Sequence, residues 1–273
     1  MNELSRYVFE TIANDGEFII SRGVAKDAGA PLLLITPSLQ QPDPASLQRL
    51  EHAFALRSDL DRAWTALPLA LVHHDEKLVL VAEDPGGEPL AYASGKPVDV
   101  AQFLRISIGL AKALGFLHAR GLIHKNVKPA SFLVNAASGD AWLTGFGIAS
   151  RLPRDHQTPE PAEVIAGTLA YMAPEQTGRM NRSIDSRSDL YSLGITFYEM
   201  LAGELPFAAN DPMEWIHCHV ARRPAPLFEK SQTVPRQLSD IVMKLLAKTV
   251  EERYQTAAGL QADLQRCRRR GVP

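Results

Sequence analysis

The sequence predicts an α+β fold in two parts, a small β-rich N-terminal lobe followed by a larger α-helical lobe. Short strand-like runs separated by turn residues fill the chain up to about residue 83. From residue 100 onward, apolar residues recur at helical spacing. A chain of 273 residues is also long for a single small core and suits a two-lobed unit.

The β-rich part is expected to hold a small sheet and one helix. The sequence Asn14-Asp15-Gly16 supplies turn chemistry between the first two strands. Leu47, Leu50 and Phe54 share one face of a helix that begins after a Pro-Asp-Pro sequence at residues 42–44. The expected strands cover residues 7–11, 17–21, 31–35, 67–71 and 78–82.

The second part is expected to be helical. Its first helix has apolar residues at helical spacing and stops at Gly121, a residue that commonly ends helices. Residues 153–163 are the least structured by pattern. The expected helices cover residues 100–120, 188–201, 212–221, 237–248 and 256–268.

Composition indicates a protein of the cytoplasm. A net charge of -2 gives no reason to expect a nucleic-acid or anionic-membrane partner. Cys218 and Cys267 are too few for a disulfide framework, which fits a reducing compartment. We expect no basic-then-apolar signal at the start of the chain, and no apolar run that approaches the length needed to span a bilayer. We therefore expect no membrane and no nucleic acid among its partners.

Three short motifs follow one another in the second half of the chain. They are HKNVKP at residues 124–129, GFG at 145–147 and APE at 173–175. Their order and spacing match the H-R-D-L-x-x-x-N, D-F-G and A-P-E motifs of protein kinases. The chain thus resembles the protein kinase superfamily. The resemblance implies a two-lobed kinase-like fold with an N-lobe at 1–83, a hinge at 84–89 and a C-lobe at 90–270.

A narrower resemblance concerns the segment from about residue 117 to residue 199. This segment is similar to the N-terminal kinase-like domain of large bacterial signalling proteins that continue into an ATPase module, a GAF sensor and a histidine kinase. The resemblance implies a regulatory domain whose partners are other proteins or the downstream domains of a longer signalling polypeptide.

The reactive positions of the family carry unusual residues here. Asn126 stands at the catalytic aspartate, and an amide can hold a hydroxyl but cannot take its proton. At the two Mg²⁺-ligand positions stand Gly145, which has no side chain, and Ser131, which has a neutral hydroxyl. Lys128 is kept, and it would either contact a phosphate or be held in the loop by inherited geometry. We therefore expect no metal site.

The small lobe lacks further parts of the nucleotide site. The strand at residues 31–36 contains no lysine, and Lys26 falls in the preceding turn. The glycine-rich loop is reduced to Gly16. In the linker, Glu83 and Pro85 would lie at the adenine, but proline has no N–H to donate to it.

The remaining matches to the family are structural. His124 and Phe146 match residues that pack in the core, and Asp189 matches the helix aspartate that braces the catalytic loop. Thr168 lies in the segment that resembles the substrate-binding segment of Ser/Thr kinases. Two further residues match the buried ion pair of the family, Glu175 and Arg253.

Several missing reactive groups favour a pseudokinase, a regulatory and protein-interaction module with weak or no ATP binding. No cofactor is then expected, or ATP bound without well-held Mg²⁺. The alternative is a residual Ser/Thr protein kinase that transfers the ATP γ-phosphate to a protein hydroxyl. A nucleotidyl transferase on the same fold would need metal carboxylates, and only Asp140 and Asp155 flank the site in sequence. The pattern His217-Cys218-His219 does not place both histidines on one helical face, so a structural role is favoured.

Overall fold

The computed structural model describes residues 3–27, 29–90, 96–151, 167–180 and 182–271. They belong to two compact units, which are described separately. The β-rich unit comprises Met1–Leu90, Ala130–Asn135 and Ala141–Ile148. The helical unit comprises Ala91–Pro129, Ala136–Asp140 and Ala149–Pro273. The predicted α+β class is confirmed, with a β-rich unit and a helical unit.

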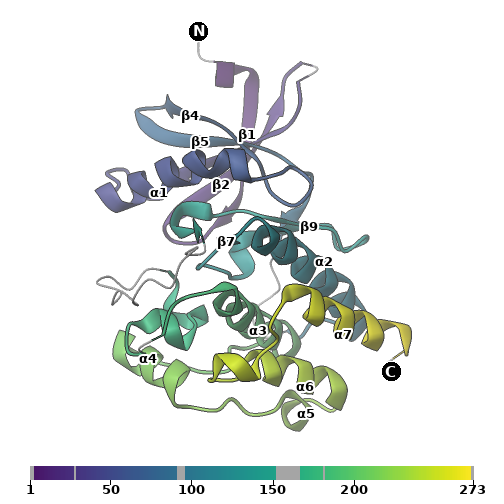
Figure 1. The fold of residues 1–273 in the computed structure, drawn as a ribbon. Helices are drawn as coiled ribbons and strands as arrows, with labels where there is room; N and C mark the ends of the chain where they lie inside the picture. The colour runs from purple at the N-terminus through teal and green to yellow at the C-terminus, as the bar shows by residue number, and fades with distance from the viewer. Residues whose placement is uncertain (1–2, 28, 91–95, 152–166, 181, 272–273) are drawn as a thin grey trace. The chain divides into compact units, whose positions relative to one another are not determined.

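An antiparallel sheet forms the centre of the β-rich unit (Figure 1). Its strands pair in the order β1-β2-β3-β5-β4. Each predicted strand is present and differs from its predicted bounds by a few residues. The strands are β1 (Tyr7–Asn14), β2 (Phe18–Ala25), β3 (Leu32–Pro37), β4 (Pro68–His74) and β5 (Lys77–Glu83).

The turn between β1 and β2 has the predicted residues in the predicted roles. Gly16 has φ +90°, a left-handed conformation that glycine adopts without steric cost. The Asp15 carboxylate accepts hydrogen bonds from the backbone N–H groups of Glu17 (3.0 Å) and Phe18 (2.7 Å). The carboxylate of Asp15 is therefore used to close its own turn.

The core of the β-rich unit lies on both faces of the sheet, because side chains alternate along a strand. Leu34 belongs to a cluster with Val79 and Val81. Its neighbour Leu33 belongs to a second cluster with Ala82 and Leu133. The helix α1 (Pro44–Ala55) contacts β4 and the turn Phe146–Ile148, and its N-cap Asp43 accepts from the Ser46 N–H at 2.6 Å.

Chain segments from beyond residue 130 complete the β-rich unit. Here β6 (Glu88–Pro89), β8 (Phe132–Val134) and β9 (Ala141–Leu143) form a small antiparallel sheet. In the helical unit, β7 (Leu122–Ile123) pairs with β10 (Ser150–Arg151). The predicted lobe boundaries at 83 and 90 stay a prediction, since the compact units are not contiguous in sequence.

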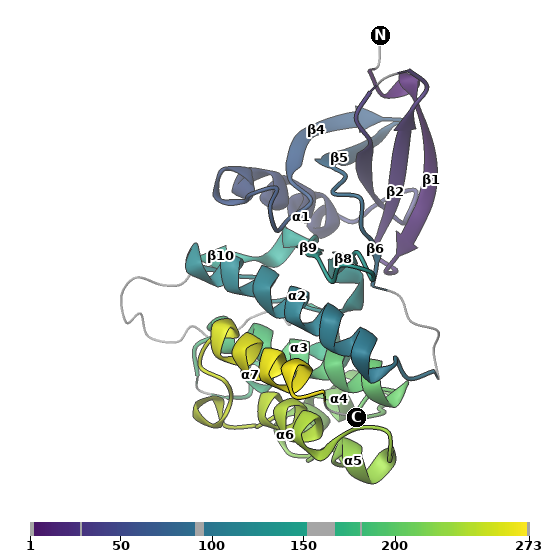
Figure 2. The ribbon, with the colours of Figure 1, turned by 90° about the vertical axis from the view of Figure 1, so that its right-hand side faces the viewer.

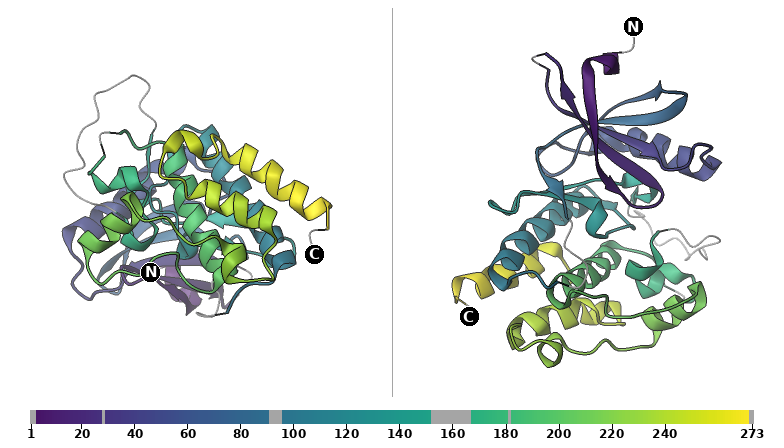
Figure 3. Two further views of the ribbon diagram at one scale, coloured as in Figure 1. Left: turned by 90° about the horizontal axis from the view of Figure 1, so that it is seen from below. Right: turned by 180° about the vertical axis from the view of Figure 1, so that it is seen from behind.

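Within its described residues, the helical unit contains each helix predicted for it and one short α-helix that was not predicted (Figures 2 and 3). The first, α2, contacts α7 and α3, and α6 also contacts both α3 and α7. Aspartate side chains cap the N-termini of α2, α3 and α4. The helices are α2 (Val100–Ala119), α3 (Ser186–Ala202), α4 (Pro212–Val220), α5 (Leu227–Lys230), α6 (Arg236–Leu245) and α7 (Ala257–Arg269).

The helix α2 differs from the sequence expectation in one respect. By length and composition alone, α2 would be long and apolar enough to cross a membrane, so the expectation that no run is long enough is wrong. Half of this apolar stretch of α2 is buried within the protein. The predicted unstructured segment at 153–163, with Asp155, lies outside the described residues.

Candidate active site

The HKNVKP segment forms a loop in the helical unit that is braced from α3. Asp189 is fully buried, and its carboxylate accepts from the backbone N–H groups of His124 and Lys125, both at 2.8 Å. Because a carboxylate only accepts, the His118 Nε2 atom at 2.9 Å from Asp189 carries a proton. One side chain on α3 thus fixes the start of the loop.

Lys125 places a bend in this loop. Its φ of +65° is uncommon for a residue other than glycine and costs about 1–3 kcal/mol. The Lys125 N–H donates to Asp189, and the Lys125 carbonyl accepts from Gln176 Nε2 at 2.8 Å. Gln176 Oε1 in turn accepts from the Ala173 N–H at 3.1 Å. The bent backbone is therefore held between α3 and the APE segment.

The side chain of Asn126 is fixed by the segment around Thr168. Its Oδ1 atom accepts both the backbone N–H and the hydroxyl of Thr168, each at 3.1 Å. The Asn126 N–H donates to His124 Nδ1 at 3.3 Å, and the His124 side chain is fully buried. The carbonyl end of the amide is therefore directed at Thr168. Two residues further on, Lys128 is 9% exposed.

The GFG segment belongs to the β-rich unit, as does Ser131. Gly145 has φ +79°, which glycine adopts freely and aspartate tolerates. Phe146 is buried, and Ser131 accepts from the Thr144 N–H through its carbonyl at 2.9 Å. At Gly147 an added Cβ would lie 2.7 Å from Arg49 Cβ, so α1 lies directly against this turn.

The linker after β5 is tied to β2 by Arg22, a residue that the sequence motifs do not mark. Arg22 Nε donates to Asp84 Oδ2 at 2.6 Å, Nη1 to Glu88 Oε1 at 2.6 Å, and Nη2 to the Gly87 carbonyl. The Asp84 side chain is 2% exposed. This clamp holds the stretch that contains Glu83 and Pro85. No local pattern indicates Arg22, because its partners lie more than sixty residues away.

The strand that should carry a nucleotide-binding lysine does not do so. β3 contains only apolar residues, one threonine and one proline. Lys26 follows the end of β2, and its Nζ donates to the Ser5 carbonyl at 3.1 Å. Lys26 is thus a turn residue, as its position in the sequence indicates.

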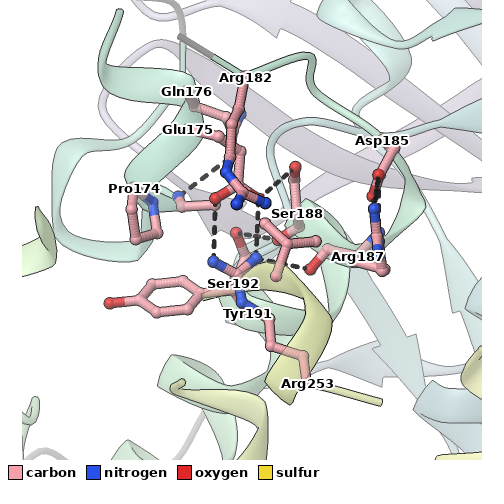
Figure 4. Close-up of polar contacts among 12 residues, drawn as sticks. Pro174, Glu175, Gln176, Arg182, Asp185, Arg187, Ser188, Tyr191, Ser192 and Arg253 are labelled. Carbon is pink, nitrogen blue, oxygen red and sulfur yellow. Dashed lines mark hydrogen bonds and ion pairs between the residues drawn. The ribbon is translucent and has the colours of Figure 1, made fainter. Parts of the chain in front are cut away.

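The APE segment is anchored by an ion pair inside the helical unit (Figure 4). Arg253 Nη1 and Nη2 donate to the two carboxylate oxygens of Glu175 at 2.7 and 2.9 Å, with both side chains at most 1% exposed. The Ser188 hydroxyl also donates to Glu175, at 2.7 Å. Arg253 Nε donates to the Ala247 carbonyl at 2.8 Å. Both charges are therefore paired and hydrogen-bonded.

The residues at the two metal positions are poor ligands for Mg²⁺. Gly145 offers no side-chain ligand, and Ser131 offers a buried hydroxyl, whereas Mg²⁺ is bound in proteins chiefly by carboxylates. Among the residues that the structure describes, no group of three His, Cys, Asp or Glu side chains could hold a metal ion. The side chains at these positions therefore do not fit a Mg²⁺ held by the protein.

The two histidines of α4 lie in different environments. His217 is exposed, whereas His219 is 1% exposed. Burial, and then the charge of Lys248, lower the pKa of His219 to about 4. The side chain of Tyr191 also contacts His219, and beyond it lie Arg253 and Glu175. The expected structural role is consistent with this burial.

We predict a pH dependence of stability from His219. Its folded pKa of about 4 lies below the unfolded value of 6.5, so the unfolded chain binds the proton first as the pH falls. This contribution is complete above pH 6.5 and is lost towards pH 4, by about 3 kcal/mol of unfolding free energy. Urea unfolding at several pH values measures it. The exposed-site variant His217→Gln should keep the slope of wild type, whereas His219→Gln should flatten it; equal slopes in all three proteins would refute the assignment.

A family model described as "Protein kinase domain" matches residues 68–264. The serine/threonine-protein kinase PknB of Mycobacterium leprae (strain TN) is 39% identical over 170 residues, 62% of this chain and 27% of that protein. A probable serine/threonine-protein kinase of Clostridium perfringens (strain 13 / Type A) is 36% identical over 173 residues, 63% of this chain and 24% of that protein.

A third relative is of a different kind. The hybrid signal transduction histidine kinase G of Dictyostelium discoideum is 47% identical over 107 residues, 39% of this chain and 3% of that protein. The chain spans about a quarter of the length of the serine/threonine kinases that it matches.

Proposed function

The chain belongs to the protein kinase domain family, and from this premise we propose that it transfers the γ-phosphate of ATP to serine or threonine hydroxyls of proteins. The β-rich and helical units are those of the two-lobed α+β kinase fold. The names of the matched serine/threonine kinases support the proposal.

This proposal replaces the main prediction from sequence. We predicted a pseudokinase with weak or no ATP binding, but the relatives that match more than half of this chain are named serine/threonine-protein kinases. The prediction is therefore wrong, and its alternative fits better. The expectation of no cofactor is wrong for the same reason, because protein kinases use ATP with Mg²⁺.

The observation that carries the proposal is the fixed position of Asn126. Asp189 braces the backbone just before it, and Thr168 holds its side-chain oxygen at 3.1 Å. A kinase aligns the substrate hydroxyl at this position of the loop. An amide can hold that hydroxyl by a hydrogen bond but does not accept its proton. We therefore propose that Asn126 orients the hydroxyl, and that the hydroxyl oxygen bonds to the γ-phosphorus while the bond to ADP breaks and the hydroxyl proton passes to water rather than to this side chain.

In this proposal Lys128 supplies the positive charge that acts on the phosphate oxygens. Phosphoryl transfer depends on positioning and on cations at the phosphate oxygens. Lys128 lies in the same loop as Asn126, two residues after it, and is buried, so the position of its charge is restricted. ATP with Mg²⁺ supplies the phosphoryl group, although Gly145 and Ser131 do not fit a metal ion held by protein side chains.

Replacing Lys128 by alanine tests this role. We expect phosphate transfer to fall about 10²-fold, the effect of removing one preorganised group that stabilises transition-state charge. Transfer is measured with γ-³²P-labelled ATP and a serine- and threonine-containing protein substrate. The matched control is Lys112→Ala, which removes an exposed lysine of α2 and should leave the rate unchanged. Equal rates for Lys128→Ala and wild type would rule out the role of Lys128.

We also propose that the domain acts within a longer signalling polypeptide. It covers only a small part of each of the three relatives described above, and one of these is a hybrid histidine kinase. Its partners in this proposal are other proteins or downstream domains of the same chain. Expression of the domain with and without the downstream sequence of its gene, followed by measurement of autophosphorylation, tests whether those domains change its activity.

A further inference from the structure

A series of hydrogen bonds connects Lys248 to the segment around Thr168 in the helical unit. Lys248 Nζ lies 3.2 Å from the Tyr191 hydroxyl, and Tyr191 lies 3.0 Å from His219 Nδ1. A protonated lysine only donates, so the tyrosine oxygen accepts from it and the tyrosine proton is directed to His219. His219 Nδ1 is therefore the acceptor.

The other ring nitrogen of His219 contacts the backbone of the segment around Thr168. Nε2 lies 2.8 Å from the Leu169 carbonyl, which can only accept. Nε2 must therefore carry the proton, and the neutral imidazole has a single tautomer here. The series of donors runs in one direction, from lysine to tyrosine to histidine to the Leu169 carbonyl.

The segment that receives this bond is the one that holds Asn126. Thr168, directly before Leu169, donates its N–H and its hydroxyl to Asn126 Oδ1. The Tyr171 N–H donates back to the Thr168 carbonyl at 2.9 Å, which closes a single turn. The turn is thus tied to the catalytic loop through Thr168 and to α4 through the Leu169 carbonyl.

The surroundings leave the His219 ring no alternative position. Trp215 stacks on it with centroids 5.9 Å apart and an interplanar angle of 18°. Phe207 meets the ring at its edge, with centroids 5.6 Å apart and an angle of 90°. Tyr191 and His219 are both at most 1% exposed. A buried polar ring with both nitrogens bonded and three aromatic neighbours, the third being Tyr191, is held in one orientation.

We propose that His219 is a positioning residue for the reaction: as the neutral Nε2–H tautomer it fixes the Leu169 carbonyl, and through Thr168 the side chain of Asn126. The part of this inference that concerns catalysis rests on the proposed kinase function. The part that concerns the tautomer and the order of the Thr168 turn does not. A second proton on His219 would remove the acceptor of Tyr191 and add a charge beside Lys248, which agrees with a pKa of about 4.

Two measurements on wild-type protein and variants test the inference without an activity assay. Long-range ¹H–¹⁵N NMR of the histidine rings at pH 7 should show His219 as the Nε2–H tautomer. Amide hydrogen exchange should give a protected Thr168 N–H in wild type. In His219→Leu the Thr168 N–H should exchange at least about tenfold faster. The variant loses the ring's bonds to Tyr191 and to the Leu169 carbonyl, and each lost bond corresponds to an exchange rate about three- to tenfold higher.

His219→Gln is the conservative variant, because its side-chain amide can still donate to the Leu169 carbonyl. It should keep Thr168 exchange close to wild type, and His217→Leu, at the exposed neighbour, should not change it. With an active protein, His219→Leu should raise the KM for the protein substrate about tenfold and leave the KM for ATP unchanged. An Nδ1–H tautomer, or Thr168 exchange in His219→Leu equal to wild type, would overturn the inference.

The two proposals fail in different ways. If wild-type protein transfers no phosphate but shows the expected tautomer and exchange, the kinase function is wrong and the positioning of the Thr168 turn stands. If phosphate is transferred and the KM of His219→Leu for the protein substrate equals that of wild type, the catalytic part of the inference is wrong.

Discussion

Replacing Arg253 by methionine should lower the free energy of unfolding by about 3–5 kcal/mol. The change removes a bidentate pair in which both side chains are at most 1% exposed, and it leaves the Glu175 carboxylate charged without its main partner. The Ser188 hydroxyl alone remains on that carboxylate. Urea unfolding at pH 7, followed by circular dichroism, measures the loss.

Two further variants separate this effect from a general loss of arginine. Arg182→Met removes an ion pair with Glu251 in which both side chains are more than 40% exposed, and should change stability by less than about 1 kcal/mol. The double variant Arg253→Met/Glu175→Leu should be more stable than Arg253→Met, because no charge is left buried without a partner. An Arg253→Met protein within about 1 kcal/mol of wild type would contradict the burial of this pair.

Replacing Asn126 by aspartate should raise the rate of phosphate transfer by about 10²–10⁴-fold. The carboxylate can accept the proton of the substrate hydroxyl, which the amide cannot do. The variant should fold as wild type does, since a carboxylate oxygen can still accept both bonds from Thr168. Transfer from γ-³²P-labelled ATP to a protein substrate measures the gain.

The matched control is Asn210→Asp, which makes the same chemical change at a position just before α4 and should leave the rate unchanged. Asn126→Ala should lower the rate below wild type, because the group that orients the hydroxyl is lost. If Asn126→Asp transfers phosphate at the wild-type rate, then Asn126 does not lie at the reacting hydroxyl.

The sequence predicts this fold well wherever a segment is long enough to show a period. The strands β1 to β5 and the helices α2, α3, α4, α6 and α7 lie within a few residues of their predicted ranges, and α1 begins at the predicted Pro-Asp-Pro sequence. Gly121 follows the C-cap of α2 directly, with φ +72°. The two- and three-residue strands β6 to β10 and the four-residue α5 were missed, because segments of that length contain no full hydrophobic period.

Within the site, motif spacing predicts backbone positions better than it predicts side-chain networks. Asp189 contacts the loop and Glu175 pairs with Arg253, as the motifs indicate. Arg22 and His219 were missed as linking residues, because each joins segments that are far apart in sequence. No pattern within one strand or one helix can mark such a residue.

The functional prediction failed for a different reason. It gave more weight to the reactive groups missing at Asn126 and Gly145 than to the scaffold that orients them. That scaffold is matched by the family model over residues 68–264, and the relatives that share it are named as kinases. The roles of Lys128, Ser131, Glu83 and Pro85 at a nucleotide remain predictions.

The most direct test of the central claim is phosphate transfer itself. Purified protein is incubated with millimolar ATP and Mg²⁺ and a serine- and threonine-containing protein substrate, and mass spectrometry locates any phosphate. Our account predicts phosphoserine or phosphothreonine in wild type, more of it in Asn126→Asp, and about 10²-fold less in Lys128→Ala. No phosphate on any residue, in either wild type or Asn126→Asp, would contradict the claim that this domain is a protein kinase in activity as well as in fold.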